Sequence, residues 1–160
     1  MSSFQKAFDL GLRYFECDVQ FTSDNVPVLL HDTTIDRTSN GSGEIGSFTY
    51  EEVKKYDFGS WKSDEYAGEP IPSLEEFLSF CKENDCIAEL DLAKRNYTLE
   101  QKTILYTMVE KMEMIYDTVF CATDDELTDY VNMSDGHIIV SVSGILSIEI
   151  AKEVLPKYED

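Results

Sequence analysis

The 160-residue sequence predicts an α/β domain in which helices cover a parallel sheet. Two observations favour this fold. After residue 72, short apolar runs alternate with amphipathic stretches of helical spacing, as in strands joined by crossover helices. Hydrophobic residues make up 42% of the chain and aromatic residues 12%, which is a globular composition. We therefore expect one domain over residues 1–160.

The start of the chain predicts a helix and then a β-hairpin. Ser2 or Ser3 would cap the helix and Gly11 would end it. The buried side of this helix would carry apolar residues, namely Phe4, Ala7, Phe8 and Leu10. RYFECDVQF predicts a strand, TSDN a turn and VPVLLHD a second extended segment. A two-residue loop at positions 24 and 25 would place Asp18 opposite His31.

Residues 33–72 are rich in glycine and predict a long ordered loop with a short helix at TYEEVKKY. Loops of this length inside a compact domain are usually functional. Trp61 within the loop is interpreted as packing rather than as a platform for substrate.

The rest of the chain predicts alternating helices and strands. SLEEFLSFCKEN would be a helix capped by Ser73 and Glu76, followed by the strand CIAELDLA. The amphipathic helix TLEQKTILYTMVEKM would bury one stripe, namely Leu99, Ile104, Leu105, Met108, Val109 and Met112. TVFCAT and HIIVSVS predict strands, DDELTDYVNM a helix, and LSIEIAKEVL a last helix stopped near Pro156. Together with RYFECDVQF, these strands make four of the barrel type.

Charge and cysteine content limit the kinds of partner and the cellular compartment that we expect for the protein. The net charge of −19 repels phosphate backbones and anionic headgroups, so we expect no nucleic-acid or membrane-surface partner. The four scattered cysteines (Cys17, Cys81, Cys86 and Cys121) are interpreted as reduced core thiols, with a Cys81–Cys86 disulfide as the less favoured alternative. No run is apolar enough to span a bilayer and no signal-peptide pattern follows Met1, so we expect a cytoplasmic protein.

A candidate metal site begins at the first strand. Glu16 and Asp18 are two positions apart, so their side chains share one face of the sheet and repel unless a cation lies between them. Glu89, on the next barrel-type strand, would open on the same rim. These oxygen ligands favour one Mg²⁺ or Ca²⁺ ion, with His31 transferring protons beside it. The competing interpretation of Glu16 and Asp18 is a solvated acidic rim, and that of His31 is a structural histidine. His137 is interpreted as a structural histidine.

The chain resembles the glycerophosphodiester phosphodiesterase family in an ordered series of motifs. ECDV, PVLLHD, DRTSNGSG, IPSLEE and AEL match the family signature in register from about Ala7 to about Leu90. The resemblance implies a TIM-type (β/α) barrel in which Glu16, Asp18 and Glu89 hold the metal and His31 is the second catalytic histidine. It also implies hydrolysis of glycerophosphodiesters, small molecules of lipid metabolism, to sn-glycerol 3-phosphate and an alcohol.

The sequence departs from the family pattern in ways that support an alternative. The family's first catalytic histidine, in an H-R-G motif before the first helix, has no match in this sequence. The lysine after the third carboxylate is replaced by Asp91, and four barrel-type strands stand in place of eight. The barrel is thus expected to be partial, with its first and last strands missing. The alternative function is a catalytically impaired fragment whose metal site serves binding or assembly, and a homo-oligomer would cover the open sheet edges. A phospholipase D-like toxin relative fits IPSLEE and DRTSNGSG less well.

Overall fold

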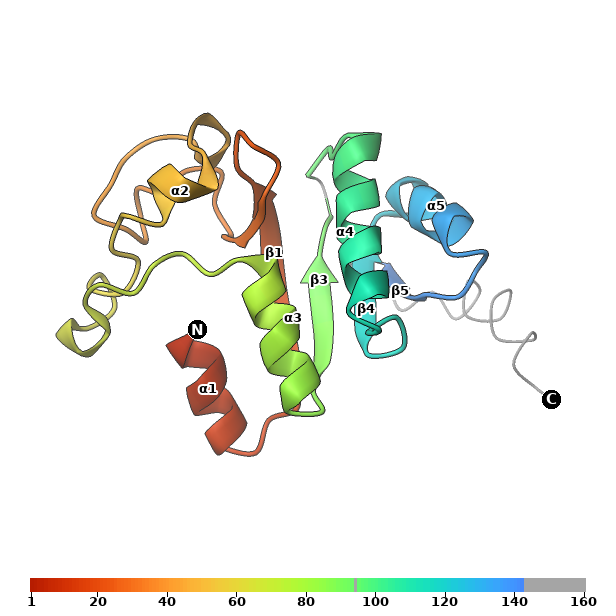
Figure 1. The fold of residues 1–160 in the computed structure, drawn as a ribbon, viewed down its shortest axis with the longest axis horizontal. Helices are drawn as coiled ribbons and strands as arrows, with labels where there is room; N and C mark the ends of the chain where they lie inside the picture. Colours follow the sequence, from red (N-terminus) through yellow and green to blue (C-terminus); the bar gives the residue numbers. More distant parts are fainter. Residues whose placement is uncertain (94, 143–160) are drawn as a thin grey trace.

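The computed structural model describes residues 1–93 and 95–142 (Figure 1). The strands are β1 (Tyr14–Phe21), β2 (Pro27–Leu29), β3 (Ile87–Asp91), β4 (Thr118–Ala122) and β5 (Ile139–Val142). The α-helices are α1 (Ser2–Asp9), α2 (Tyr50–Val53), α3 (Leu74–Glu83), α4 (Leu99–Lys111) and α5 (Asp124–Met133). Short 3₁₀ helices occupy η1 (Ile45–Ser47) and η2 (Asp64–Tyr66). The predicted helix LSIEIAKEVL lies outside the described residues.

One five-stranded sheet organises the described chain, in the order β2-β1-β3-β4-β5. β1, β3, β4 and β5 are parallel, whereas β2 pairs with β1 in the antiparallel sense. The four parallel strands predicted from the sequence are therefore confirmed.

Alternation along β1 separates a core face from a polar face. Phe15, Cys17 and Val19 are buried, whereas Glu16 and Asp18 between them point to the opposite side of the sheet. The buried face packs against helices that run alongside the strands in Figure 1, with a core that includes Leu74, Phe77 and Leu78 of α3, Leu105 and Val109 of α4, and Leu127 and Tyr130 of α5. Because the helices take the apolar face, the acidic side chains are left on the other.

Residues 33–72 form an ordered segment, as the sequence predicted, and this segment packs with residues of and next to β2 around a second, small core. This second core consists of Val28, Leu30, Ile35, Ile45, Val53 and Ile71. Gly59 is required by a close backbone approach, since a Cβ there would lie 1.7 Å from the carbonyl oxygen of Tyr66.

Helix caps agree with the sequence at α3 and differ at α1. The backbone N–H of Glu76 donates to Ser73 Oγ (3.2 Å) and that of Ser73 to Glu76 Oε2 (2.8 Å), which is the predicted capping box. At α1 the N-cap is Met1 and no side chain caps the helix. Leu10, predicted to be buried, is exposed because it follows the last helical residue, beyond the reach of the core.

The predicted apolar stripe of α4 is wrong at its first position. Leu99 is exposed because it is the first helical residue and precedes the part of α4 that meets the core. Lys102 is buried in its place, with Nζ 2.6 Å from Asp129 Oδ2 on α5. The aliphatic stem of a lysine can fill such a position once its charge is paired.

The four cysteines are free thiols, as predicted, so the alternative Cys81–Cys86 disulfide is not formed. Cys17, Cys81 and Cys86 are buried, but Cys121 is only half-buried because it lies on the polar face of β4. Within the described part of the chain, no helix combines the length and apolar character needed to cross a membrane.

Candidate active site

Carboxylates from two neighbouring parallel strands meet on the polar face of the sheet. Glu16 of β1 pairs in register with Glu89 of β3, and Asp18 pairs with Asp91. Ligand oxygens of Glu16, Asp18 and Asp91 all lie within 4.8 Å of one another. Parallel pairing and the two-residue period of each strand produce this arrangement from the spacing of the acids alone.

Only part of the negative charge of this group is compensated. Burial, and then Asp18, Asp91 and Glu89, raise the pKa of Glu16, while His31 acts weakly in the opposite direction. A guanidinium nitrogen of Arg95, Nη2, lies 2.5 Å from Asp18 Oδ1. Three hard oxygen donors with one neighbouring cation fit a divalent metal ion of the Mg²⁺ or Ca²⁺ type.

Glu89, predicted as the third metal ligand, lies next to this group. It lies beside Glu16 across β1 and β3, but its Oε2 accepts a hydrogen bond from the hydroxyl of Tyr14. Burial and this bond raise the pKa of Tyr14, so the phenol remains a donor. Asp91, at the position where the family has a lysine, lies in the group with Glu16 and Asp18. Its position two residues after Glu89, and hence on the same face, was the available signal.

The predicted hairpin register is wrong by one residue. Phe21 pairs with Pro27 and Val19 with Leu29, so Asp18 lies opposite Leu30 rather than opposite His31. The loop contains three residues, 23–25, because Thr22 and Val26 still share a backbone hydrogen bond. Asn25 takes a left-handed conformation (φ 58°) that such a three-residue loop requires.

His31 is positioned by a chain of charged side chains instead. Its Nδ1 lies 2.8 Å from Asp32 Oδ1, and Asp32 also accepts two hydrogen bonds from Arg37, at 2.7 and 3.0 Å. These bonds from Arg37, and then from His31, hold the pKa of Asp32 well below its usual range. A carboxylate can only accept, so Nδ1 carries the proton and Nε2 is the free ring nitrogen. The side chain of His31 is 72% exposed.

Arg95 connects this histidine to the carboxylates. Its Nη1 donates to the carbonyl oxygen of His31 at 2.8 Å while its Nη2 is bonded to Asp18. Arg95, Asp32 and Arg37 are not among the site residues predicted from the sequence. The HD pair and the arginine of DRTSNGSG were visible as family matches, but their mutual contact depends on the loop conformation.

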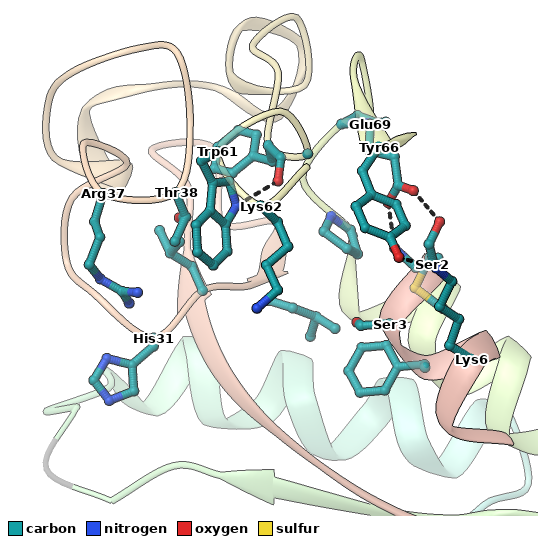
Figure 2. Close-up of a pocket in the computed structure, with 18 residues that line it drawn as sticks. Ser2, Ser3, Lys6, His31, Arg37, Thr38, Trp61, Lys62, Tyr66 and Glu69 are labelled. Atoms are coloured by element: carbon teal, nitrogen blue, oxygen red, sulfur yellow. Dashed lines mark hydrogen bonds and ion pairs between the residues drawn. The ribbon is translucent and has the colours of Figure 1, made fainter. Parts of the chain in front are cut away.

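A cavity of about 530 Å³ opens next to His31 (Figure 2). Trp61 lines it, with its indole nitrogen 3.0 Å from the carbonyl oxygen of Phe58 and 51% of the residue exposed. The interpretation of Trp61 as loop packing therefore holds for its indole N–H only, because its ring faces the cavity. His137 lies at the opposite, amino-terminal end of the sheet, where its Nδ1 is 3.0 Å from the carbonyl oxygen of Ser134.

The profile of the Glycerophosphoryl diester phosphodiesterase family matches residues 1–141. The chain belongs to this family. Among curated family relatives, the glycerophosphodiester phosphodiesterase of Caldanaerobacter subterraneus is 39% identical over 92 residues, covering 58% of this chain and 38% of its own length. Mouse glycerophosphodiester phosphodiesterase 1 is 27% identical over 145 residues, covering 89% and 44% respectively. The chain thus spans less than half the length of these two relatives.

Solved structures of family members confirm the barrel-type α/β fold. A glycerophosphodiester phosphodiesterase from Agrobacterium tumefaciens matches with a TM-score of 0.74 at 20% identity, over 96% of this chain and 75% of that one. An Oleispira antarctica phosphodiesterase, solved with the product sn-glycerol-3-phosphate, matches with a TM-score of 0.75 at 22% identity, over 96% and 64%. The five-stranded sheet corresponds to part of such a barrel.

Proposed function

We propose that this chain hydrolyses glycerophosphodiesters to sn-glycerol 3-phosphate and an alcohol at the carboxylate group beside His31. The observation that carries the proposal is the convergence of Glu16, Asp18 and Asp91 next to an oriented imidazole. Family membership and the product named for the Oleispira antarctica relative support the choice of substrate.

The carboxylates are proposed to hold one divalent cation, Mg²⁺ or Ca²⁺. Such an ion, when bound, neutralises charge on the phosphodiester oxygens. Glu16 and Asp18 belong both to the group of converging carboxylates and to the metal ligands implied by the family resemblance. The third member differs: it is Asp91 in the converging group and Glu89 in the family resemblance. We propose Asp91 as the third ligand and Glu89 as a fourth carboxylate beside it, held by Tyr14.

His31 is proposed to move a proton at Nε2 to or from the reacting oxygen. Asp32 holds the ring through Nδ1 and stabilises the imidazolium that forms when Nε2 takes the proton. Arg37 keeps Asp32 ionised and in place, so the orientation of the ring does not depend on substrate.

An assay on glycerophosphocholine tests the proposal. With Mg²⁺ or Ca²⁺ the chain is expected to release choline, and EDTA is expected to abolish the release. A chain that releases no choline with either cation would overturn it. Cation-dependent thermal stabilisation without turnover would instead support the second candidate, a binding or assembly element, which the only partly compensated charge of the carboxylates favours.

The identity of the third ligand has its own test in calorimetric titration with Ca²⁺. Asp91→Asn is expected to weaken Ca²⁺ binding by about tenfold or more, and Glu89→Gln by less, since only Asp91 lies within the geometric group. Glu83→Gln, an exposed acid at the end of α3, is the matched control and is expected to leave the affinity unchanged. A larger loss in Glu89→Gln than in Asp91→Asn would assign the third position to Glu89.

A further inference from the structure

The cavity beside His31 has the size and wall of a small-molecule site. It is bounded by the start of α1, the end of β2 and residues 58–72, and its volume of about 530 Å³ is typical of ligand pockets. Its wall combines aromatic and basic side chains, including Phe58, Trp61, Tyr66, Lys6, Arg37 and Lys62. Figure 2 shows Lys62 extending beside Trp61 into the middle of the cavity, between His31 and Ser3.

The charge of this wall is opposite to that of the whole protein. The chain carries −19, yet Glu69 is the one acidic side chain among the cavity-lining residues, and it is hydrogen-bonded to Ser2. Three of the four lining cations are paired: Arg37 with Asp32, Lys6 with Glu65, and the amino terminus with Glu69. Within residues 1–93 and 95–142, no carboxylate lies at ion-pair distance from Lys62.

The aromatic rings do not form a cage for a quaternary ammonium group. The ammonium of Lys62 lies 5.9 Å from the centroid of the Trp61 ring, and that of Lys6 lies 4.7 Å from the centroid of Tyr66. Trp61 and Tyr66 therefore each already have a cation near the ring, and a second cation at these two rings would be repelled. An anionic group would instead be attracted to Lys62.

The cavity and the proposed reaction site share one wall. His31 lines the cavity, and its carbonyl oxygen is bonded to Arg95, which is in turn bonded to Asp18 of the carboxylate group. A diester whose phosphate lies at the carboxylates would extend past His31 into this cavity.

We propose that the cavity binds the alcohol part of the diester and selects alcohols that carry a further anionic group, a carboxylate or a phosphate, through Lys62. This inference rests on the proposed function, because it assumes that the phosphodiester lies at the carboxylates. The contact is a single charge pair in a partly open cavity, so its effect is a preference rather than an absolute requirement.

The single tryptophan makes the cavity directly observable, because Trp61 is the only one in the chain and lies in the wall. Its emission is to be followed during titration with glycerophosphoserine, glycerophosphoinositol 4-phosphate and glycerophosphocholine in the presence of Mg²⁺. The carboxylate and phosphate compounds are expected to bind about fivefold more tightly than the choline compound. That preference should shrink as NaCl is raised to about 1 M.

Lys62→Gln is expected to remove the preference, whereas Lys55→Gln, an exposed lysine outside the cavity wall, keeps it. No emission change with any compound, equal affinities for all three, or a preference that survives Lys62→Gln would overturn the inference. Release of sn-glycerol 3-phosphate is measured in parallel. If sn-glycerol 3-phosphate is released but the anionic compounds are not preferred, the inference is overturned and the proposed function stands. If the anionic compounds are preferred through Lys62 but no sn-glycerol 3-phosphate is released, the proposed function is overturned and the binding preference stands.

Discussion

Glu16→Gln is expected to lower the rate of choline release from glycerophosphocholine by about 10³-fold, because it removes a ligand from the proposed cation site. The change is nearly isosteric and leaves the buried face of β1, formed by Phe15, Cys17 and Val19, untouched. The loss should therefore appear in turnover and in cation affinity, without loss of folded structure.

The same variant has an opposite expected effect on metal-free stability. Burial and neighbouring carboxylates raise the pKa of Glu16, so its ionised form is less favourable in the folded chain than in the unfolded chain. Its contribution to stability is present below its usual pKa and is lost as pH rises through the raised one. In EDTA at pH 7 the Tm of Glu16→Gln is thus expected to exceed that of the parent chain, by an amount that grows from pH 4 to pH 7.

Added Mg²⁺ or Ca²⁺ should raise the Tm of the parent chain and have much less effect on Glu16→Gln. Glu83→Gln provides the control, because it removes one exposed carboxylate from the end of α3 without touching the site. Parent-like turnover together with a parent-like response to cations in Glu16→Gln would refute the assignment of the site to β1.

Side-chain alternation was the part of the site most accessible from sequence. The two-residue period of β1 fixes Glu16 and Asp18 on one face whatever the neighbouring strands do, and the structure confirms this. The parallel neighbour then brings Glu89 and Asp91 alongside. Asp91 lies in the group with Glu16 and Asp18, whereas Glu89 accepts a hydrogen bond from the hydroxyl of Tyr14, and alternation alone does not distinguish these two positions.

The position of His31 shows where sequence reasoning was weakest. The hairpin was correctly predicted, but its loop contains three residues rather than the expected two. One extra residue is enough to change which side chains lie opposite each other. The histidine still reaches the site because Asp32, Arg37 and Arg95 hold it there. These contacts join residues up to 64 positions apart and are set by the packing of the loop.

The apolar periodicity of a helix also did not predict which residues at its ends are exposed. The helical stripe places Leu10 and Leu99 on the apolar side of their helices, but neither end meets the sheet. An apolar pattern indicates which face of a helix is buried, whereas the length of the partner sheet decides where along the helix burial stops.

His31→Gln is expected to lower choline release by about 10²–10⁴-fold, the usual contribution of a positioned acid or base. Glutamine can still accept or donate a hydrogen bond, but its amide is neither an acid nor a base near neutral pH, so the loss isolates proton transfer from binding. The side chain is 72% exposed and Asp32, to which it is hydrogen-bonded, remains bonded to Arg37, so the Tm should change little.

His137→Gln is the matched control, since His137 is the second histidine of the chain and lies at the other end of the sheet. Its turnover should equal that of the parent chain. Calcium affinity should also be retained in His31→Gln, because His31 does not belong to the group of side chains proposed to bind the cation. If choline release fell equally in both variants, or Ca²⁺ affinity fell with it in His31→Gln, the loss would be structural and His31 would not be the proton carrier.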